Sequence, residues 1–307
     1  MAKWFDSTCE QLEHWIKSVL ITCFVKEDAW VFEVNSGDGS EIGKWQRAKI
    51  QQLTAADKDE NNLIKLLDRS IRKRYTALPF TLKCDISTER IDWSNIEAMP
   101  TFNIPENFLT DESLPKLLPN VTDQPHMGRY DSVACFTGLA FHHEETALTL
   151  IKNVSDLLKE GGFFFGIMPD SSVLFTKAHN QQTVNGVVKG EDYEIAFPNG
   201  NVTEFFQDYF QPKPITFRAF TEPNKEVKEA SLYLVHCPTL IKICAQNNLA
   251  MIEIQNLAEF YEENRKLHEN NLKKILGTLK VHGKHTLRLG FYTMFAFQKR
   301  PVSFREH

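Results

Sequence analysis

Residues 29–47 read AWVFEVNSGDGSEIGKWQR, and this stretch decides the fold class. Residues 29–34 form a short apolar run of large and β-branched side chains, which predicts a buried strand. The run breaks at the turn-rich loop 35–39, and residues 40–47 are typical of a helix with Ser40 as a possible N-cap. A strand, a glycine loop and a helix in this order open a doubly wound α/β sheet.

The sequence on both sides of this stretch continues the α/β pattern. Apolar residues at helical spacing predict helices at 11–24, 61–75 and 144–158. Short apolar runs predict further strands at 51–56, 80–83, 130–136 and 163–167, with Glu160-Gly161-Gly162 ending the helix before the last of them. Alternating strands and helices favour a mostly parallel sheet with helices on both faces.

The C-terminal half has a different pattern. Short alternating runs broken by Pro, Gly and Asn predict an antiparallel, β-rich insertion at about 184–225, which could cover a pocket. Beyond it we predict helices at 238–247 and over most of 257–279, and strands at 251–254 and 291–297, the final strand being antiparallel. Residues 100–127 are rich in Pro, Asn and Asp and predict a loop. No convincing linker interrupts the chain, so we expect one domain over 1–307.

Composition excludes several classes of protein. The formal net charge of the 307 residues is -5, so an extended grip on nucleic acid is not expected, whereas recognition of a short end needs only a few local Lys or Arg. The 6 cysteines form no C-x-x-C pair, so we expect no metal site. We find no secretory signal and no apolar run long enough for a membrane, so we expect a protein of a reducing compartment, cytosol or nucleus.

Three acidic residues accompany three successive predicted strands. Glu33 lies beside the glycine loop, Asp57 follows the second strand and Asp85 follows the third. Ligands of open α/β sheets bind beyond the carboxyl ends of the strands, so these carboxylates are expected to face one crevice. Asp57 could accept ribose hydroxyls, and Asp85 could approach an adenine amino group. A dinucleotide such as NAD is a rival ligand, but its G-x-G-x-x-G pattern is absent.

Motifs spread over nearly the whole chain are typical of one family. They are residues 14–21, 31–39, 44–45 with Ile50, 130–133, Asn153 with 157–171, 233–235 with Pro238, 259–263 and 292–299. Through them the sequence resembles the eukaryotic mRNA cap guanine-N7 methyltransferases, and within that family it is most similar to the divergent second type of plants.

The resemblance implies a Rossmann-like class I methyltransferase fold and the cofactor S-adenosyl-L-methionine. The implied acceptor is N7 of the guanosine cap at the 5′ end of mRNA, and nuclear location and contacts with capping-machinery proteins follow from it. The implied cofactor-binding residues are Lys17 at the methionine end, Asp57 at the ribose, Asp85 on the adenine side, and Glu33, Asn35, Gly37, Gly39 and Phe136. The implied cap residues are Phe141, Pro169 and Tyr292. No catalytic acid, base or nucleophile is expected, because the N7 lone pair is already available and catalysis comes from proximity and orientation.

Several positions depart from the family pattern. Asn35 replaces the first loop glycine, Phe136 a glutamine that touches the cofactor, and Leu232 the glutamate that reads the guanine edge, although Glu229 is near. Glu13-His14 stands for an Asn pair, and Ala140-Phe141 for a His-Tyr pair, although Phe141 could still stack on a base.

These departures leave three hypotheses open. The chain is an active cap methyltransferase, a catalytically weak or inactive relative that binds RNA or partners the active enzyme, or a methyltransferase with another acceptor. His142-His143 and the basic run 69–74 invite catalytic and RNA-binding interpretations, but solvated surface residues explain both.

Overall fold

A computed structural model of the chain describes residues 7–74, 78–93, 126–136, 139, 144–180, 185–190, 193–200, 202–205, 214–220, 227–277, 281 and 283–301. The predicted loop at 100–127 lies almost entirely outside these residues, as do Ala140, Phe141 and the His142-His143 pair. Within the described residues, no helix is long and apolar enough to cross a membrane.

The described strands form a seven-stranded sheet in the order β10-β11-β5-β4-β1-β2-β3. Their bounds are β1 Trp30–Val34, β2 Gln52–Asp57, β3 Phe80–Lys83, β4 Tyr130–Cys135, β5 Leu158–Pro169, β10 Leu249–Asn256 and β11 Tyr292–Lys299. Pairing is parallel from β3 to β5, whereas β11 runs antiparallel to both of its neighbours. The predicted mixed sheet and its antiparallel final strand are confirmed.

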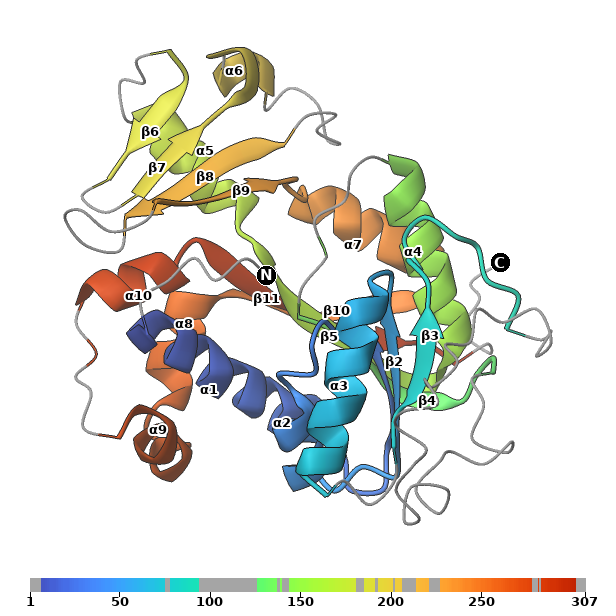
Figure 1. Cartoon of the computed structure of the whole chain (residues 1–307). Helices are drawn as coiled ribbons and strands as arrows, with labels where there is room; N and C mark the ends of the chain where they lie inside the picture. Colours follow the sequence, from blue (N-terminus) through green and yellow to red (C-terminus); the bar gives the residue numbers. More distant parts are fainter. Residues whose placement is uncertain are drawn as a thin grey trace.

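Helices cover both faces of this sheet and bury two hydrophobic clusters (Figure 1). They are α1 Ser7–Phe24, α2 Ile42–Arg47, α3 Glu60–Arg72, α4 Glu144–Leu157, α7 Cys237–Gln246, α8 Leu257–Asn264, α9 Glu269–Leu276 and α10 Gly283–Leu289. Trp15 of α1, Trp45 of α2 and Phe260 of α8 fill one cluster, while α4 and α7 pack on the other. The odd and even residues of β11 divide between the two clusters, as strand alternation requires.

A second, antiparallel sheet of the described residues has the order β6-β7-β8-β9. Its strands are β6 Val187–Lys189, β7 Tyr193–Ala196, β8 Ile215–Phe220 and β9 Val227–Leu232, accompanied by α5 Ser171–Asn180 and α6 Val202–Phe205. It stands beyond the carboxyl end of β5 (Figure 1), where Tyr193 packs edge-on against Phe291 at 4.8 Å between ring centroids. The predicted β-rich insertion is thus confirmed, with its last strand ending later than expected.

The structure corrects three local predictions. The N-cap of α2 is Glu41 and not Ser40; the Glu41 side chain makes no capping bond and instead forms ion pairs with Lys17 and Lys44. Asp57 is the last residue of β2 and does not follow it. Strand β5 begins directly after α4. Gly161, where we expected the helix to end, lies inside this strand with a φ of 76°.

Candidate functional site

A cavity of about 620 Å³ opens where α1, the loop after β1 and α3 meet at the carboxyl edge of the large sheet. Its lining residues are Glu10, Glu13, His14, Lys17, Glu33, Asn35, Ser36, Gly37, Asp38, Ser40, Glu41, Asn62, Lys65, Arg69, Lys73 and Phe136. Five of the predicted cofactor residues therefore share one cavity, namely Lys17, Glu33, Asn35, Gly37 and Phe136.

The loop after β1 turns through three residues of positive φ. Asn35 has a φ of 50°, Gly37 of 58° and Gly39 of 75°. Asparagine is among the few residues that enter this region readily, so Asn35 preserves the backbone turn where the family has glycine. A Cβ on Gly37 would meet no atom within 4 Å, whereas one on Gly39 would lie 2.9 Å from Cα of Leu66. Gly37 thus keeps the cavity open, and Gly39 lets α3 pack against the loop.

Asp57 holds this loop in place. Its Oδ2 accepts a hydrogen bond from the Gly37 N–H at 2.8 Å, and its Oδ1 accepts from the Asp59 N–H at 2.8 Å and the Asn62 amide at 3.2 Å. A carboxylate offers about four acceptor positions, so these bonds leave little spare capacity. Asp57 is buried and does not line the cavity, although it bonds directly to Gly37, which does.

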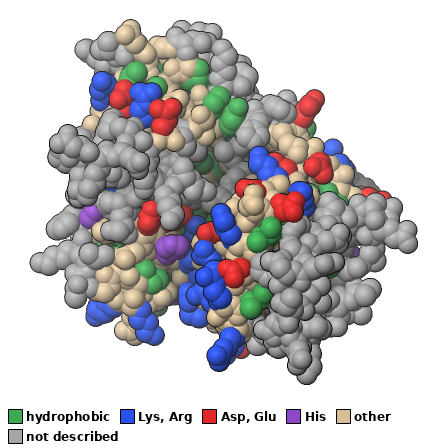
Figure 2. All heavy atoms as spheres, in the orientation of Figure 1, with side chains coloured by type: hydrophobic (Ala, Val, Ile, Leu, Met, Phe, Trp, Pro, Cys, Tyr) green, Lys and Arg blue, Asp and Glu red, His purple; other side chains and the backbone are tan. Residues whose placement is uncertain are grey.

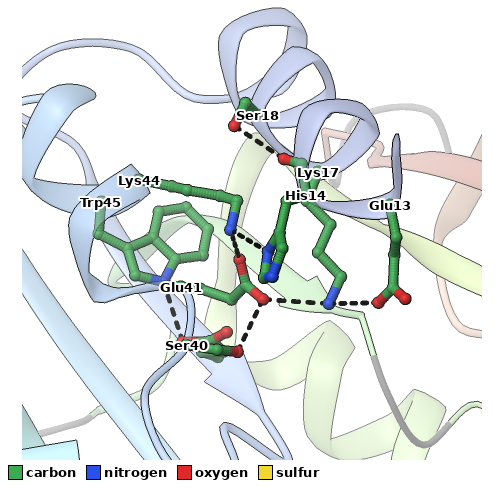
Figure 3. A network of polar contacts seen from close by, with 9 residues as sticks. Glu13, His14, Lys17, Ser18, Ser40, Glu41, Lys44 and Trp45 are labelled. Atoms are coloured by element: carbon green, nitrogen blue, oxygen red, sulfur yellow. Dashed lines mark hydrogen bonds and ion pairs between the residues drawn. The ribbon is translucent and has the colours of Figure 1, made fainter. Parts of the chain in front are cut away.

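A buried network of charges forms the wall next to α1 (Figure 3). Lys17 Nζ lies 2.7 Å from Glu13 Oε1 and 3.0 Å from Glu41 Oε1. The other carboxylate oxygen of Glu41 pairs with Lys44, whose Nζ also lies 3.0 Å from Nδ1 of His14. Unpaired charges are costly to bury, so this network depends on every member being present.

The network separates the pKa values of its members. Burial alone would lower the pKa of Lys17, but the carboxylates of Glu13 and Glu41 outweigh burial and raise it. Burial likewise opposes ionisation of Glu41, yet Lys17 and Lys44 hold its pKa at about 2. Burial lowers the pKa of His14, and the Lys44 charge lowers it further. Lys17 and Glu41 are therefore charged at neutral pH.

Glu33 and Phe136 form the floor beneath Lys17. Burial, with repulsion from Glu41 second, raises the pKa of Glu33 to about 8, although Trp45 Nε1 donates to its Oε2 at 2.9 Å. Phe136 is buried, stacks on Trp45 at 6.1 Å between centroids, and lies under Lys17 with Nζ 5.6 Å from its ring centre. An aromatic ring thus occupies the place of the family's glutamine.

The remaining predicted residues do not line this cavity. Asp85 accepts from the Ser87 N–H at 3.0 Å and lies 3.9 Å from Lys58 Nζ, at the turn after β3. Pro169 and Tyr292 are register partners at the ends of β5 and β11 and are both buried. Glu229 is exposed on β9 and bound to Arg218 at 2.7 Å. The Leu232 side chain and the whole of Phe141 lie outside the described residues.

Sequence reasoning missed the charged partners of Lys17. Glu13 precedes Lys17 by four residues and Glu41 precedes Lys44 by three, which are ordinary helical ion-pair spacings. Those spacings were visible in the sequence. The pairing of Lys17 with Glu41 joins residues 24 apart and depends on how α1 packs against α2, so no local pattern could have indicated it.

Comparison with known proteins identifies the family. The model of the mRNA (guanine-N(7))-methyltransferase domain matches residues 8–300. The chain belongs to this family. It is 35% identical over 190 residues to mRNA cap guanine-N(7) methyltransferase 2 of Oryza sativa subsp. japonica, covering 55% of this chain and 52% of the rice protein. It is 28% identical over 316 residues to mRNA cap guanine-N(7) methyltransferase 2 of Arabidopsis thaliana, covering 97% of this chain and 80% of that protein.

A solved structure agrees on the fold. The CcbJ methyltransferase of Streptomyces caelestis has a TM-score of 0.52 and 11% identity, and the match covers 97% of this chain and 94% of that one. A likeness at this identity shows the fold alone. The chain therefore has the α/β fold of S-adenosylmethionine-dependent methyltransferases, as predicted.

The cavity of this cap methyltransferase family member fits S-adenosyl-L-methionine, the cofactor of its family. The open space over Gly37 is a cradle that any Cβ would begin to fill. Ser36 Oγ also lines the cavity, is buried, and has no hydrogen-bond partner within the described residues. A buried hydroxyl of this kind calls for a ligand or a water. Lys17 supplies a positive charge suited to the carboxylate of a methionine end.

Proposed function

We propose that this protein transfers a methyl group from S-adenosyl-L-methionine to N7 of the guanosine cap at the 5′ end of mRNA. The observation that carries the proposal is the shared cavity of Lys17, Gly37 and Phe136, in a chain whose family match runs over residues 8–300. The bound cofactor supplies an electrophilic methyl group on sulfur. Lys17 binds its methionine end, while Glu33, Asn35, Gly37, Gly39 and Phe136 form the surrounding loop and floor. Asp57 orders this loop through the Gly37 N–H and has one acceptor position left for the ribose. Asp85, at the turn after β3, stays our candidate for the adenine side.

The chain's own part in the reaction is to hold and align. Guanine N7 carries an available lone pair, so no side chain needs to remove a proton. Alignment of two bound reactants can account for a large share of such a rate enhancement. Pro169 and Tyr292, at the neighbouring strand ends, would frame the cap together with Phe141. We therefore assign no catalytic acid, base or nucleophile.

The basic face of α3 supports an RNA 5′ end as the acceptor. Lys65, Arg69 and Lys73 recur at four-residue spacing and line the cavity. Figure 2 displays Lys and Arg side chains gathered over α3. Arg69 is paired with Asp38 at 2.8 Å, which leaves Lys65 and Lys73 as the better candidates for phosphate contacts. A few local cations suit a short recognised end, in keeping with a net charge of -5.

A second candidate is a methyltransferase of the same cofactor with another acceptor. It is motivated by the departure at Leu232 expected from the resemblance, since Glu229, a nearby carboxylate, is exposed and bound to Arg218. We also propose nuclear location and contacts with capping-machinery proteins, on family membership alone. Immunofluorescence of the tagged protein tests the location.

The test of the proposed function is methyl transfer from labelled S-adenosyl-L-methionine to three RNAs of one sequence. They carry an unmethylated guanosine cap, an N7-methylated cap and a 5′ triphosphate. We expect label on the first RNA alone, and its loss in Asp57→Ala. Label on all three RNAs would favour the second candidate, whereas bound cofactor without transfer to any of them would contradict the proposal.

A further inference from the structure

Glu13 occupies a distinctive place beside the proposed cofactor lysine. It lies on α1 one turn before Lys17, lines the cavity, and its carboxylate approaches Lys17 Nζ to 2.7 Å. Figure 3 shows the Lys17 ammonium between Glu13 on one side and Glu41 on the other. The Glu13 side chain keeps 18% of its exposure, compared with 3% for Glu41, so Glu13 is the more accessible of the two carboxylates.

Glu41 has its acceptor positions taken. It receives Lys17 at 3.0 Å and Ser40 Oγ at 2.9 Å on Oε1, and Lys44 on Oε2. In the part of the chain that the structure describes, the ion pair of Glu13 is with Lys17, and Glu13 also lies near Tyr292, whose pKa is raised first by burial and then by the Glu13 charge. A carboxylate has room for about four donors, so Glu13 retains most of its capacity toward the cavity.

A methionine end presents two opposite charges on one carbon atom. Its α-carboxylate suits Lys17, and the α-ammonium then lies one bond away from the same carbon. A carboxylate within 3 Å of the lysine is well placed to receive it, and charge-assisted hydrogen bonds are the strong ones. We propose that Glu13 binds the α-ammonium of the cofactor while Lys17 binds its α-carboxylate.

The charge balance of the cavity supports this role. Glu13 and Glu41 offset Lys17 and Lys44, and a zwitterionic methionine end adds no net charge to the buried network. Glu13 would therefore make amino-group recognition in this chain electrostatic. The inference rests on the cofactor part of the proposed function and not on its acceptor.

The test is a calorimetric titration with S-adenosylhomocysteine and with its analogue that lacks the α-amino group. The variant is Glu13→Gln, and the matched control is Glu27→Gln, which also removes a carboxylate from a lysine, Lys49, but does not line the cavity. We expect Glu13→Gln to weaken the affinity for S-adenosylhomocysteine by about tenfold, as loss of a hydrogen bond to a charged group does, and to leave the affinity for the deaminated analogue unchanged. Glu27→Gln should change neither affinity.

Equal weakening of both ligands by Glu13→Gln would overturn the proposal, because it would mean that Glu13 acts through Lys17 or through the fold. An unchanged affinity for S-adenosylhomocysteine would overturn it as well. If the variant fails to fold, the wild-type protein decides: it should bind S-adenosylhomocysteine at least about tenfold more tightly than the deaminated analogue. Equal wild-type affinities contradict the proposal. No RNA enters these titrations, so failure of cap methylation leaves their result intact.

Discussion

Replacement by alanine should affect different properties at the two glycines of the loop after β1, mainly stability at Gly39 and mainly ligand affinity at Gly37. In Gly39→Ala, the new Cβ would lie 2.9 Å from Leu66 Cα and 3.1 Å from Ile42 Cγ1, at a φ of 75°. The left-handed backbone costs alanine about 1 kcal/mol, and forcing a methyl group into a packed site adds about 1–3 kcal/mol. We therefore expect Gly39→Ala to lose about 2–4 kcal/mol of stability.

Gly37→Ala carries the backbone cost of about 1 kcal/mol without a clash, because its Cβ meets no atom within 4 Å. Its methyl group instead fills space in the cavity, so it should keep the fold and lose most of its affinity for S-adenosylhomocysteine. Urea unfolding measures the two stabilities, and titration calorimetry measures the affinity. The reasoning is refuted if Gly39→Ala is as stable as Gly37→Ala, or if Gly37→Ala binds like the wild type.

Three further substitutions probe the charges of the site. Lys17→Met leaves Glu41 and Glu13 without a shared partner, so it should destabilise the fold by about 3 kcal/mol or more and abolish S-adenosylhomocysteine binding. An unchanged midpoint of urea unfolding would argue against a buried network. Folding raises the pKa of Glu33 from 4.5 to about 8, so between these pH values the folded state retains a proton that the unfolded state releases. The stability of the wild type should therefore fall relative to that of Glu33→Gln as pH rises from about 4.5 to about 8. Parallel stability profiles of the two proteins over that window would contradict this. Lys73→Gln should weaken binding of capped RNA and reduce its salt dependence; an identical salt slope would remove α3 from the acceptor site.

The sequence predicted the succession and type of the main strands well, because each apolar run, although short, is bounded by turn residues. Boundaries were less certain where two roles compete for one residue. Ser40 resembles an N-cap, but the cap position falls to Glu41, whose side chain is held by Lys17 and Lys44. Helices α5 and α10 were not predicted, since they are short, at 10 and 7 residues.

The candidate site was predictable in outline and not in its contacts. The glycine loop indicated where a ligand would bind, and the family resemblance indicated Lys17. The hydrogen bond that Asp57 accepts from the Gly37 N–H was not apparent from the sequence, because it depends on how the ends of β1 and β2 align. The pairing of Glu13 with Lys17 could be predicted from the helix spacing. The role we propose for Glu13 also depends on the second ion pair of Lys17, with Glu41 at the start of α2, which the spacing does not show.

The most direct test of the central claim is to locate the transferred methyl group. RNA with an unmethylated guanosine cap is incubated with the protein and labelled S-adenosyl-L-methionine, then digested with nuclease P1, and the labelled product is identified by chromatography and mass spectrometry. The account predicts label in the cap dinucleotide, on N7 of its guanine, with Lys17→Met giving none. Label on an internal nucleotide or on another atom of the cap, or no transfer by protein that binds S-adenosylhomocysteine, would contradict it.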